Sequence, residues 1–182
     1  MDKQYWRQRP AAELAPWVSD IIGYAENGIR LTGAIETASL VVPLVISFGA
    51  PFAIALGRPP APTERFGSFT SGLFAGHVVI DSTGASACVQ VNFTPLGAFR
   101  FFGVPVGELC GRMVPLEDMS DAGLGELRIR WRSLRVTPDS DVTRNSKNMA
   151  NAGSSAAAGV VHSGDGFRRE DRWRGSRHLV RG

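Results

Sequence analysis

The 182-residue chain contains only two cysteines, Cys88 and Cys110, and they form neither a C-x-x-C motif nor another metal-binding spacing. This gives no basis for a disulfide framework and indicates a reducing compartment, for which we expect the cytoplasm. The first residues lack the apolar core of a secretory signal, so we expect none. Lysine is nearly absent, since 18 of the 20 basic residues are arginines, a bias typical of a GC-rich coding sequence.

An excess of positive charge is missing from most of the chain. Residues 1–120 hold 8 basic and 10 acidic side chains, whereas residues 121–182 hold 12 and 7. The formal net charge of +3 therefore comes entirely from the last third. A protein that binds nucleic acid through a uniformly basic surface is excluded.

Catalytic motifs are also missing. The sequence has no G-x-S-x-G, P-loop or H-E-x-x-H motif, and its glycines form no dinucleotide fingerprint. His162 and His178 have no Glu or Cys at metal-ligand spacing. We therefore expect no enzyme, no cofactor and no metal site. His77 lies in an apolar run, where a core or interface histidine is the ordinary interpretation; an unfamiliar enzyme site around it is the remaining alternative.

The longest uncharged run, residues 37–57, has the length of a transmembrane helix. Two prolines and a glycine interrupt it, and most of its apolar residues are β-branched. We therefore predict two buried strands, Leu40–Ser47 and Phe52–Leu56, with a turn at Gly49-Ala50-Pro51 and no membrane span.

Local patterns predict several other elements. A helix over Arg9–Tyr24, started by Pro10, is indicated by apolar residues at helical spacing: Leu14, Trp17, Val18 and Ile21. Strands are predicted over Phe66–Phe74 and His77–Ile80.

The clearest strand is Cys88–Thr94, in which apolar and polar residues alternate. Thr94 and Pro95 then have the order of a helix N-cap and first turn, and Gly103 is placed to end that helix. A further short helix is indicated by Leu109, Cys110 and Met113, and another element begins at Leu116.

Apolar residues become scarce near the end of the chain. Between residues 136 and 165 only 5 of 30 residues are large and apolar. Such a composition cannot offset an ordering cost of about 1–2 kcal/mol per residue. We therefore predict an α+β fold with one domain, residues 5–127, built on an antiparallel β sandwich or barrel with short helices. Residues 128–182 are predicted to be a disordered, basic, low-complexity tail.

Aromatic residues provide the candidate site. They either line a ligand pocket or form the core, and both interpretations stay open. The candidate pocket residues are Phe69, Phe74, His77, Phe93, Phe99 and Phe102. Arginines of the tail are candidates for contacts with nucleic acid, against the alternative of an unselected basic end: Arg174, Arg177 and Arg181.

The run Val89–Pro105 and four further segments in order carry a family resemblance over about residues 8–127. Together they resemble the N-terminal domain of AraC-type bacterial transcriptional regulators. The other segments are Arg9–Val18, Leu44–Phe52, Ser68–Leu73 and Val114–Asp118.

The resemblance implies an effector-sensing or dimerising domain, followed in the family by a helical linker and two helix-turn-helix units that bind DNA. The 55 residues after Leu127 are too few for that DNA-binding domain and show almost no helical periodicity. We therefore expect this chain not to bind DNA specifically, and a frameshift near codons 127–135 or a truncation explains the loss. The expected partners are an unknown small-molecule effector and a second copy or a full-length regulator. The alternative function is a stand-alone module that binds a small molecule or forms hetero-dimers.

Overall fold

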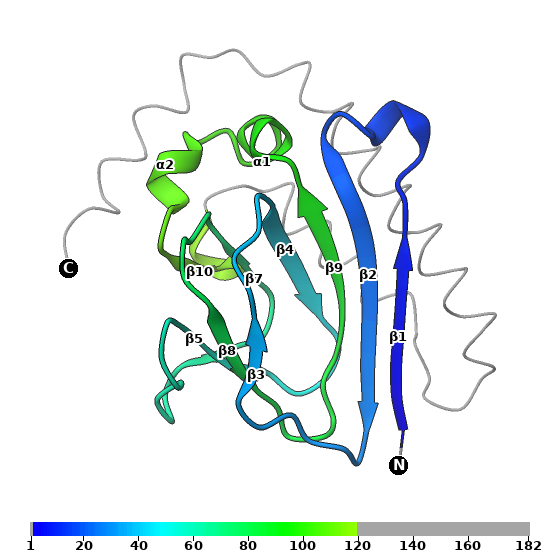
Figure 1. The fold of residues 1–182 in the computed structure, drawn as a ribbon, viewed down its shortest axis with the longest axis vertical. Helices are drawn as coiled ribbons and strands as arrows, with labels where there is room; N and C mark the ends of the chain where they lie inside the picture. The colour runs from blue at the N-terminus through cyan, green and yellow to red at the C-terminus, as the bar shows by residue number, and fades with distance from the viewer. Residues whose placement is uncertain (1, 120–182) are drawn as a thin grey trace.

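The computed structural model describes residues 2–119, which form two antiparallel sheets and a few short helices (Figure 1). The predicted α+β class on antiparallel strands is confirmed. The strands are β1 (Asp2–Gln8), β2 (Val18–Asn27), β3 (Ala34–Glu36), β4 (Val42–Ser47), β5 (Phe52–Leu56), β6 (Arg65–Phe66), β7 (Phe69–Ser71), β8 (Val78–Asp81), β9 (Ala87–Phe93) and β10 (Met113–Pro115). The helices are α1 (Pro95–Phe102) and α2 (Val106–Leu109), with the 3-10 helices η1 (Ala12–Leu14) and η2 (Leu116–Asp118).

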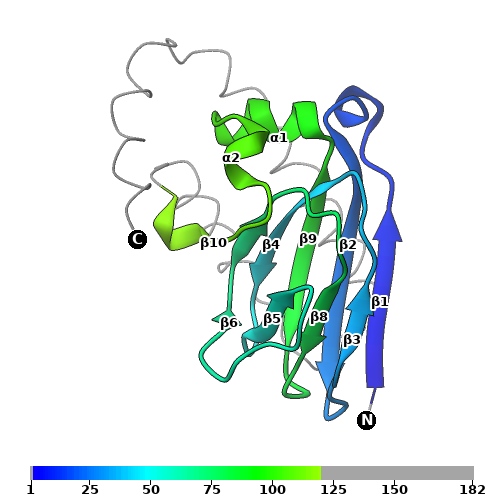
Figure 2. The same cartoon turned by 60° about the vertical axis from the view of Figure 1, so that its left-hand side comes forward.

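The larger sheet has the strand order β1-β2-β9-β4-β7-β10, and the smaller has the order β3-β8-β5-β6. The smaller sheet lies across one face of the larger, as both views show (Figure 2). The two sheets do not close into a barrel, so the sandwich alternative describes the fold and the barrel alternative does not. Helices α1 and α2 both lie at the same end of the sheets (Figure 1).

Strand β9 has the alternation that the sequence predicts, and its two faces meet different parts of the molecule. Val89, Val91 and Phe93 belong to the main core cluster. Cys88 and Gln90 face the smaller sheet and the space between the sheets. One face of β9 therefore serves stability and the other is available to a site.

The main core also receives side chains from the helices. Ala98 and Phe102 of α1, Leu109 of α2 and Leu116 of η2 are all buried in it. The ring of Phe93 packs edge-on against Phe102 at a centroid distance of 5.9 Å. The helices therefore cover the core face of the larger sheet at its end rather than the space between the sheets.

Helix α1 begins and ends where the sequence predicts. Thr94 accepts a hydrogen bond from the Gly97 amide at 3.0 Å through its hydroxyl, as an N-cap does, and Pro95 is the first helical residue. Gly103 adopts the left-handed conformation, φ 67°, that terminates helices. The same Thr94 hydroxyl donates to the Pro16 carbonyl at 3.0 Å, which attaches the helix start to the segment before β2.

The helix predicted over Arg9–Tyr24 is wrong. The segment forms η1 and then β2, a strand paired with β1 on one side and β9 on the other. Of the four residues that indicated a helix, only Val18 and Ile21 lie in β2, and the register shift between Val18 and Asp20 gives these two buried residues a spacing of three. Pairing on both edges and burial of β-branched Val18 and Ile21 outweigh the helical spacing.

Three other predictions differ in their boundaries. The strand expected over Phe66–Phe74 is divided into β6 and β7, which belong to different sheets. Strand β8 begins at Val78, after His77. The helix expected through Met113 ends at Leu109, because the chain turns at Gly111 with φ 66° and enters β10.

The uncharged run at residues 37–57 contains β4 and β5, joined by the predicted turn. The turn is held by the first residue of β9 and the loop before it, since the amides of Phe48 and Ala50 donate to the carbonyls of Ala87 and Ala85. Among residues 2–119, no helix has the length and apolar character needed to span a membrane. The predicted tail, residues 128–182, lies outside the described residues, as does the end of the predicted domain.

Candidate functional site

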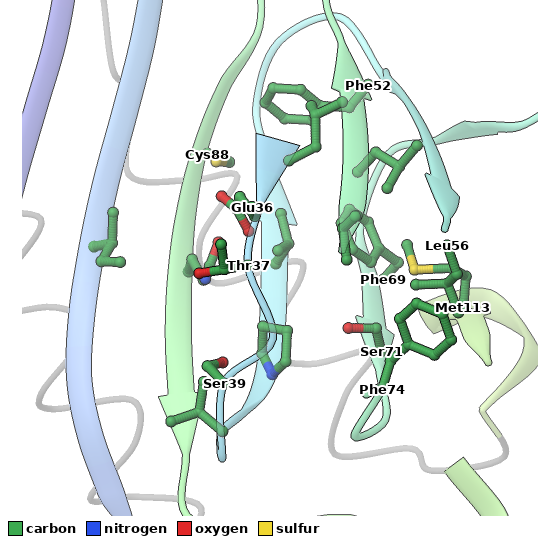
Figure 3. A pocket seen from close by; sticks show the side chains of 18 of the residues that line it. Glu36, Thr37, Ser39, Phe52, Leu56, Phe69, Ser71, Phe74, Cys88 and Met113 are labelled. Atoms are coloured by element: carbon green, nitrogen blue, oxygen red, sulfur yellow. The ribbon is translucent and has the colours of Figure 1, made fainter. Parts of the chain in front are cut away.

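A cavity of about 220 Å³ lies between the two sheets (Figure 3). The larger sheet contributes residues of β1, β2, β4, β7, β9 and β10, and the smaller sheet contributes β3, β5 and β8. Segment 37–41, which leads from β3 of one sheet to β4 of the other, also lines it. The cavity is therefore lined by elements that the chain brings together from nearly its whole described length.

Most of the cavity lining is apolar. Phe52, Ile54, Phe69 and Cys88 also belong to a second core cluster between the sheets, so the cavity borders packed structure. The ring of Tyr24 lies 6.1 Å from that of Phe52, centroid to centroid. An apolar molecule of suitable size would be removed from water here on several sides.

Glu36, the last residue of β3, brings a carboxylate to the cavity (Figure 3). Its side chain is accessible to solvent, yet nearby protein atoms remove part of its hydration, and this desolvation raises the pKa of the carboxyl above its ordinary 4.5. Within residues 2–119, no side chain or backbone group forms a hydrogen bond or an ion pair with it. The cavity therefore contains an acid without a protein partner.

The thiol of Cys88 lines the same cavity from β9. Its burial, followed by the negative charges of Glu36 and Glu26, raises the pKa of the thiol to about 12. The thiol is therefore protonated at neutral pH and is a poor nucleophile. Cys88 therefore serves as a small buried hydrophobe.

Tyr24 presents its ring to the cavity while its hydroxyl is used elsewhere. The hydroxyl donates to Glu26 at 2.5 Å, and burial followed by this hydrogen bond raises the pKa of Tyr24. Glu26 also accepts from the Ser82 hydroxyl and from the amides of Gly84 and Ser86. The Glu26 carboxylate thus holds β2 against the loop between β8 and β9. This fixes the position of the strand that carries Tyr24.

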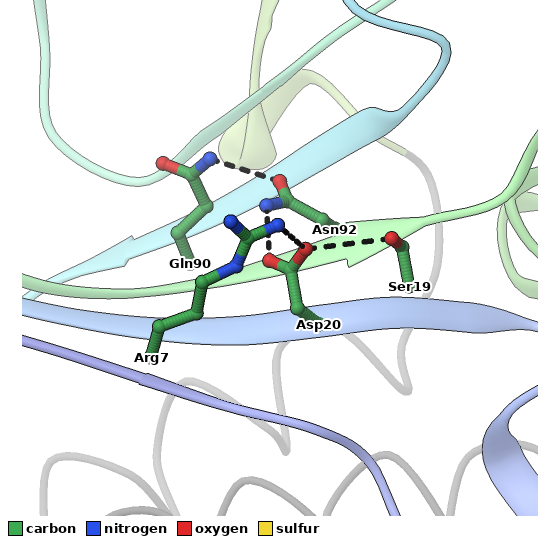
Figure 4. A network of polar contacts seen from close by, with 5 residues as sticks. All are labelled: Arg7, Ser19, Asp20, Gln90 and Asn92. Atoms are coloured by element: carbon green, nitrogen blue, oxygen red, sulfur yellow. Dashed lines mark hydrogen bonds and ion pairs between the residues drawn. The ribbon is translucent and has the colours of Figure 1, made fainter.

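A polar network reaches the cavity through Gln90 (Figure 4). Gln90 donates to Asn92 at 2.9 Å, and Asn92 donates to the buried carboxylate of Asp20 at 2.6 Å. Arg7 of β1 donates to the other oxygen of Asp20 at 2.5 Å, and Ser19 approaches it at 3.4 Å. The network satisfies the buried acid and orients the side chain of Gln90.

The structure brings only two of the six predicted pocket residues to the cavity, Phe69 and Phe74. Phe93 and Phe102 lie in the main core on the other face of the larger sheet. Phe99 is on α1 and is 45% exposed. The sequence left open whether these aromatic residues line a pocket or form the core. Phe69 and Phe74 line the pocket, whereas Phe93 and Phe102 form part of the core.

One further expectation needs correction. His77 was interpreted as a core or interface histidine; it is exposed and does not line the cavity, so the core interpretation is wrong. Cys110 is exposed as well, whereas Cys88 is buried. The candidate nucleic-acid residues Arg174, Arg177 and Arg181 lie outside the described residues. Within the described part of the chain, no group of three His, Cys, Asp or Glu residues is placed to hold a metal ion.

Sequence reasoning missed the polar residues of the cavity, chiefly Glu36, Tyr24 and Gln90. Gln90 had a signal, because it occupies a polar position of the alternating strand β9. Glu36 had a weaker one, as the acid immediately before the long uncharged run. Comparisons of the chain with protein-family models, curated proteins and solved structures find no match.

Proposed function

We propose that residues 2–119 are the effector-sensing part of an AraC-type transcriptional regulator and that the effector binds between the two sheets. The observation that carries the proposal is the cavity of about 220 Å³, with an apolar lining and a few polar groups. The motif resemblance over Val89–Pro105 supports the family. The proposal places the chain in the cytoplasm, where such regulators act.

The size and lining of the cavity define the effector by chemistry. A cavity of about 150 Å³ accommodates benzene, so this one takes a molecule on the order of ten non-hydrogen atoms. Apolar rings from both sheets would remove the body of that molecule from water. Glu36 and Gln90 would fix its orientation through hydrogen bonds.

The location of the cavity gives the effector a way to change the protein. A molecule between the sheets contacts both, and it also contacts segment 37–41, which connects them. Strand β9, which contributes Gln90 to the cavity, continues through Thr94 directly into α1. An effector that binds one arrangement of sheets and helix more tightly than another shifts the population toward it.

A thermal-shift screen of the full chain tests the proposal. The screen uses cationic, neutral and anionic molecules of about this size, together with a cavity-blocking variant, Val78→Trp. Val78 lines the cavity, whereas Leu96 on α1 is 60% exposed, so Leu96→Trp is the matched control. We expect at least one molecule to raise the Tm of the wild type and the control but not of the blocked variant. A screen without any such molecule, or a response that Val78→Trp leaves intact, contradicts the proposal.

A further inference from the structure

One charged side chain lines the cavity among residues 2–119. Among the described residues that line it, Glu36 is acidic and none is a lysine, arginine or histidine. A second acid, Glu26, affects the cavity residue Cys88 through its charge, but it already accepts hydrogen bonds from Tyr24, Ser82 and two backbone amides. Glu36 accepts none in this part of the chain. The charged atoms that a bound molecule would meet in the lining are therefore the oxygens of one carboxylate, beside neutral polar groups such as Gln90.

A carboxylate that lines a cavity and has no hydrogen-bond partner among residues 2–119 is free to pair with a bound molecule, and a cation is the group with which it forms the strongest hydrogen bond. The rings of Phe52 and Phe69 lie on the walls of the cavity (Figure 3), and Tyr24 lines it as well. Aromatic faces attract cations and also bury apolar groups, so they suit a molecule that combines the two.

We propose that the effector is a small amine whose ammonium group pairs with Glu36 and whose apolar body lies against Phe52 and Phe69. This inference rests on the proposed function and narrows it to one chemical class. A carboxylate of the same size would be repelled by Glu36. A neutral alcohol would keep the apolar contacts and lose the charge-assisted pair.

Isothermal titration calorimetry with the full chain tests the class at neutral pH. The probes are 2-phenylethylamine, 2-phenylethanol and phenylacetate, which share a phenyl ring and differ in charge. The variants are Glu36→Gln and, as a control, Glu13→Gln, which removes the same charge from an exposed site on η1. We expect the amine to bind the wild type about tenfold more tightly than the alcohol, because charged hydrogen bonds exceed neutral ones. Phenylacetate should bind most weakly.

In Glu36→Gln, the affinity for the amine should fall by about tenfold, and that for the alcohol should change by less than about twofold. Glu13→Gln should change neither. Equal binding of amine and alcohol, or an amine preference that survives Glu36→Gln, overturns the amine class while the binding of the alcohol still supports a sensing cavity. Absence of amine binding overturns the class as well. The proposed function itself fails only if the wider screen and the Val78→Trp variant also contradict it.

Discussion

Asn92 donates a hydrogen bond from its side-chain amide to Asp20 at 2.6 Å and thereby connects β9 to the one buried carboxylate that the described residues contain. The same carboxylate accepts a hydrogen bond from Arg7 of β1. Asp20 therefore joins three adjacent strands, β1, β2 and β9. Asn92 also accepts from Gln90, which lines the cavity. The wall of the candidate site is thus supported by a network that begins at the edge strand.

Removing the side-chain amide of Asn92 should therefore lower the stability of the protein. Asn92→Ala leaves an oxygen of buried Asp20 without its donor, and we expect the free energy of unfolding to fall by about 1–3 kcal/mol in urea denaturation. Arg7→Gln should have a smaller effect, because the Arg7 side chain is 62% exposed and its ion pair is accessible to solvent. An Asn92→Ala variant as stable as the wild type would contradict this role of the network.

Helix α1 packs so closely on the segment before β2 that residue 97 must be glycine. A Cβ at Gly97 would lie 1.9 Å from the Trp17 carbonyl oxygen, whereas a Cβ at Gly107 in α2 would meet no atom within 4 Å. We expect Gly97→Ala to lower stability by about 1–3 kcal/mol and Gly107→Ala to be neutral or slightly stabilising. Thermal unfolding of both variants makes the comparison, and equal melting temperatures would contradict the close approach.

The two cysteines should differ in reactivity. Cys110 is exposed, whereas Cys88 is buried and its thiol has a pKa raised to about 12. With a thiol reagent at pH 8, we expect one thiol of the folded chain to react quickly and the second only on unfolding. Cys110→Ser should remove the fast reaction, and Cys88→Ser should leave it unchanged. Two fast thiols in the native chain would show that Cys88 is not enclosed.

The loop after β5 depends on a carboxylate with a lowered pKa. Arg58 donates to both oxygens of Glu64, and the Ala61 amide donates to it as well; these contacts lower the pKa of Glu64 to about 2. Because the folded pKa is lowered, the stabilisation is present above the ordinary 4.5 and is lost as the pH falls toward 2. NMR titration of the Glu64 carboxyl should show a midpoint near pH 2. Arg58→Gln should raise this midpoint, but it should stay below 4.5 because the Ala61 amide still donates to Glu64. An unchanged midpoint in Arg58→Gln would contradict the assignment to Arg58.

Elements with complete local signals could be predicted from the sequence. Strand β9 was predicted because its side chains alternate, and α1 because Thr94, Pro95 and Gly103 mark both of its ends. These signals lie within about fifteen residues of one another and require no knowledge of the rest of the chain. Strand β2 could not be predicted in this way, since its conformation depends on the partners β1 and β9 on either side.

The candidate site was less accessible to prediction, because residue type does not reveal which face of a sheet a side chain occupies. Phe69 and Phe93 are both buried phenylalanines on strands, yet one borders the cavity and the other fills the opposite core. Glu36 lies on a three-residue strand without a recognisable pattern. Glu36 comes close to Cys88 only in the folded protein, because β3 and β9 are more than fifty residues apart in the sequence.

NMR of the methyl-labelled chain with 2-phenylethylamine tests the central claim, binding between the sheets, most directly. We expect intermolecular nuclear Overhauser effects from the phenyl protons to the methyl groups of Val78, Ile80 and Met113, which line the cavity. Contacts to Leu96 on α1, or no contacts at saturating amine, would contradict it.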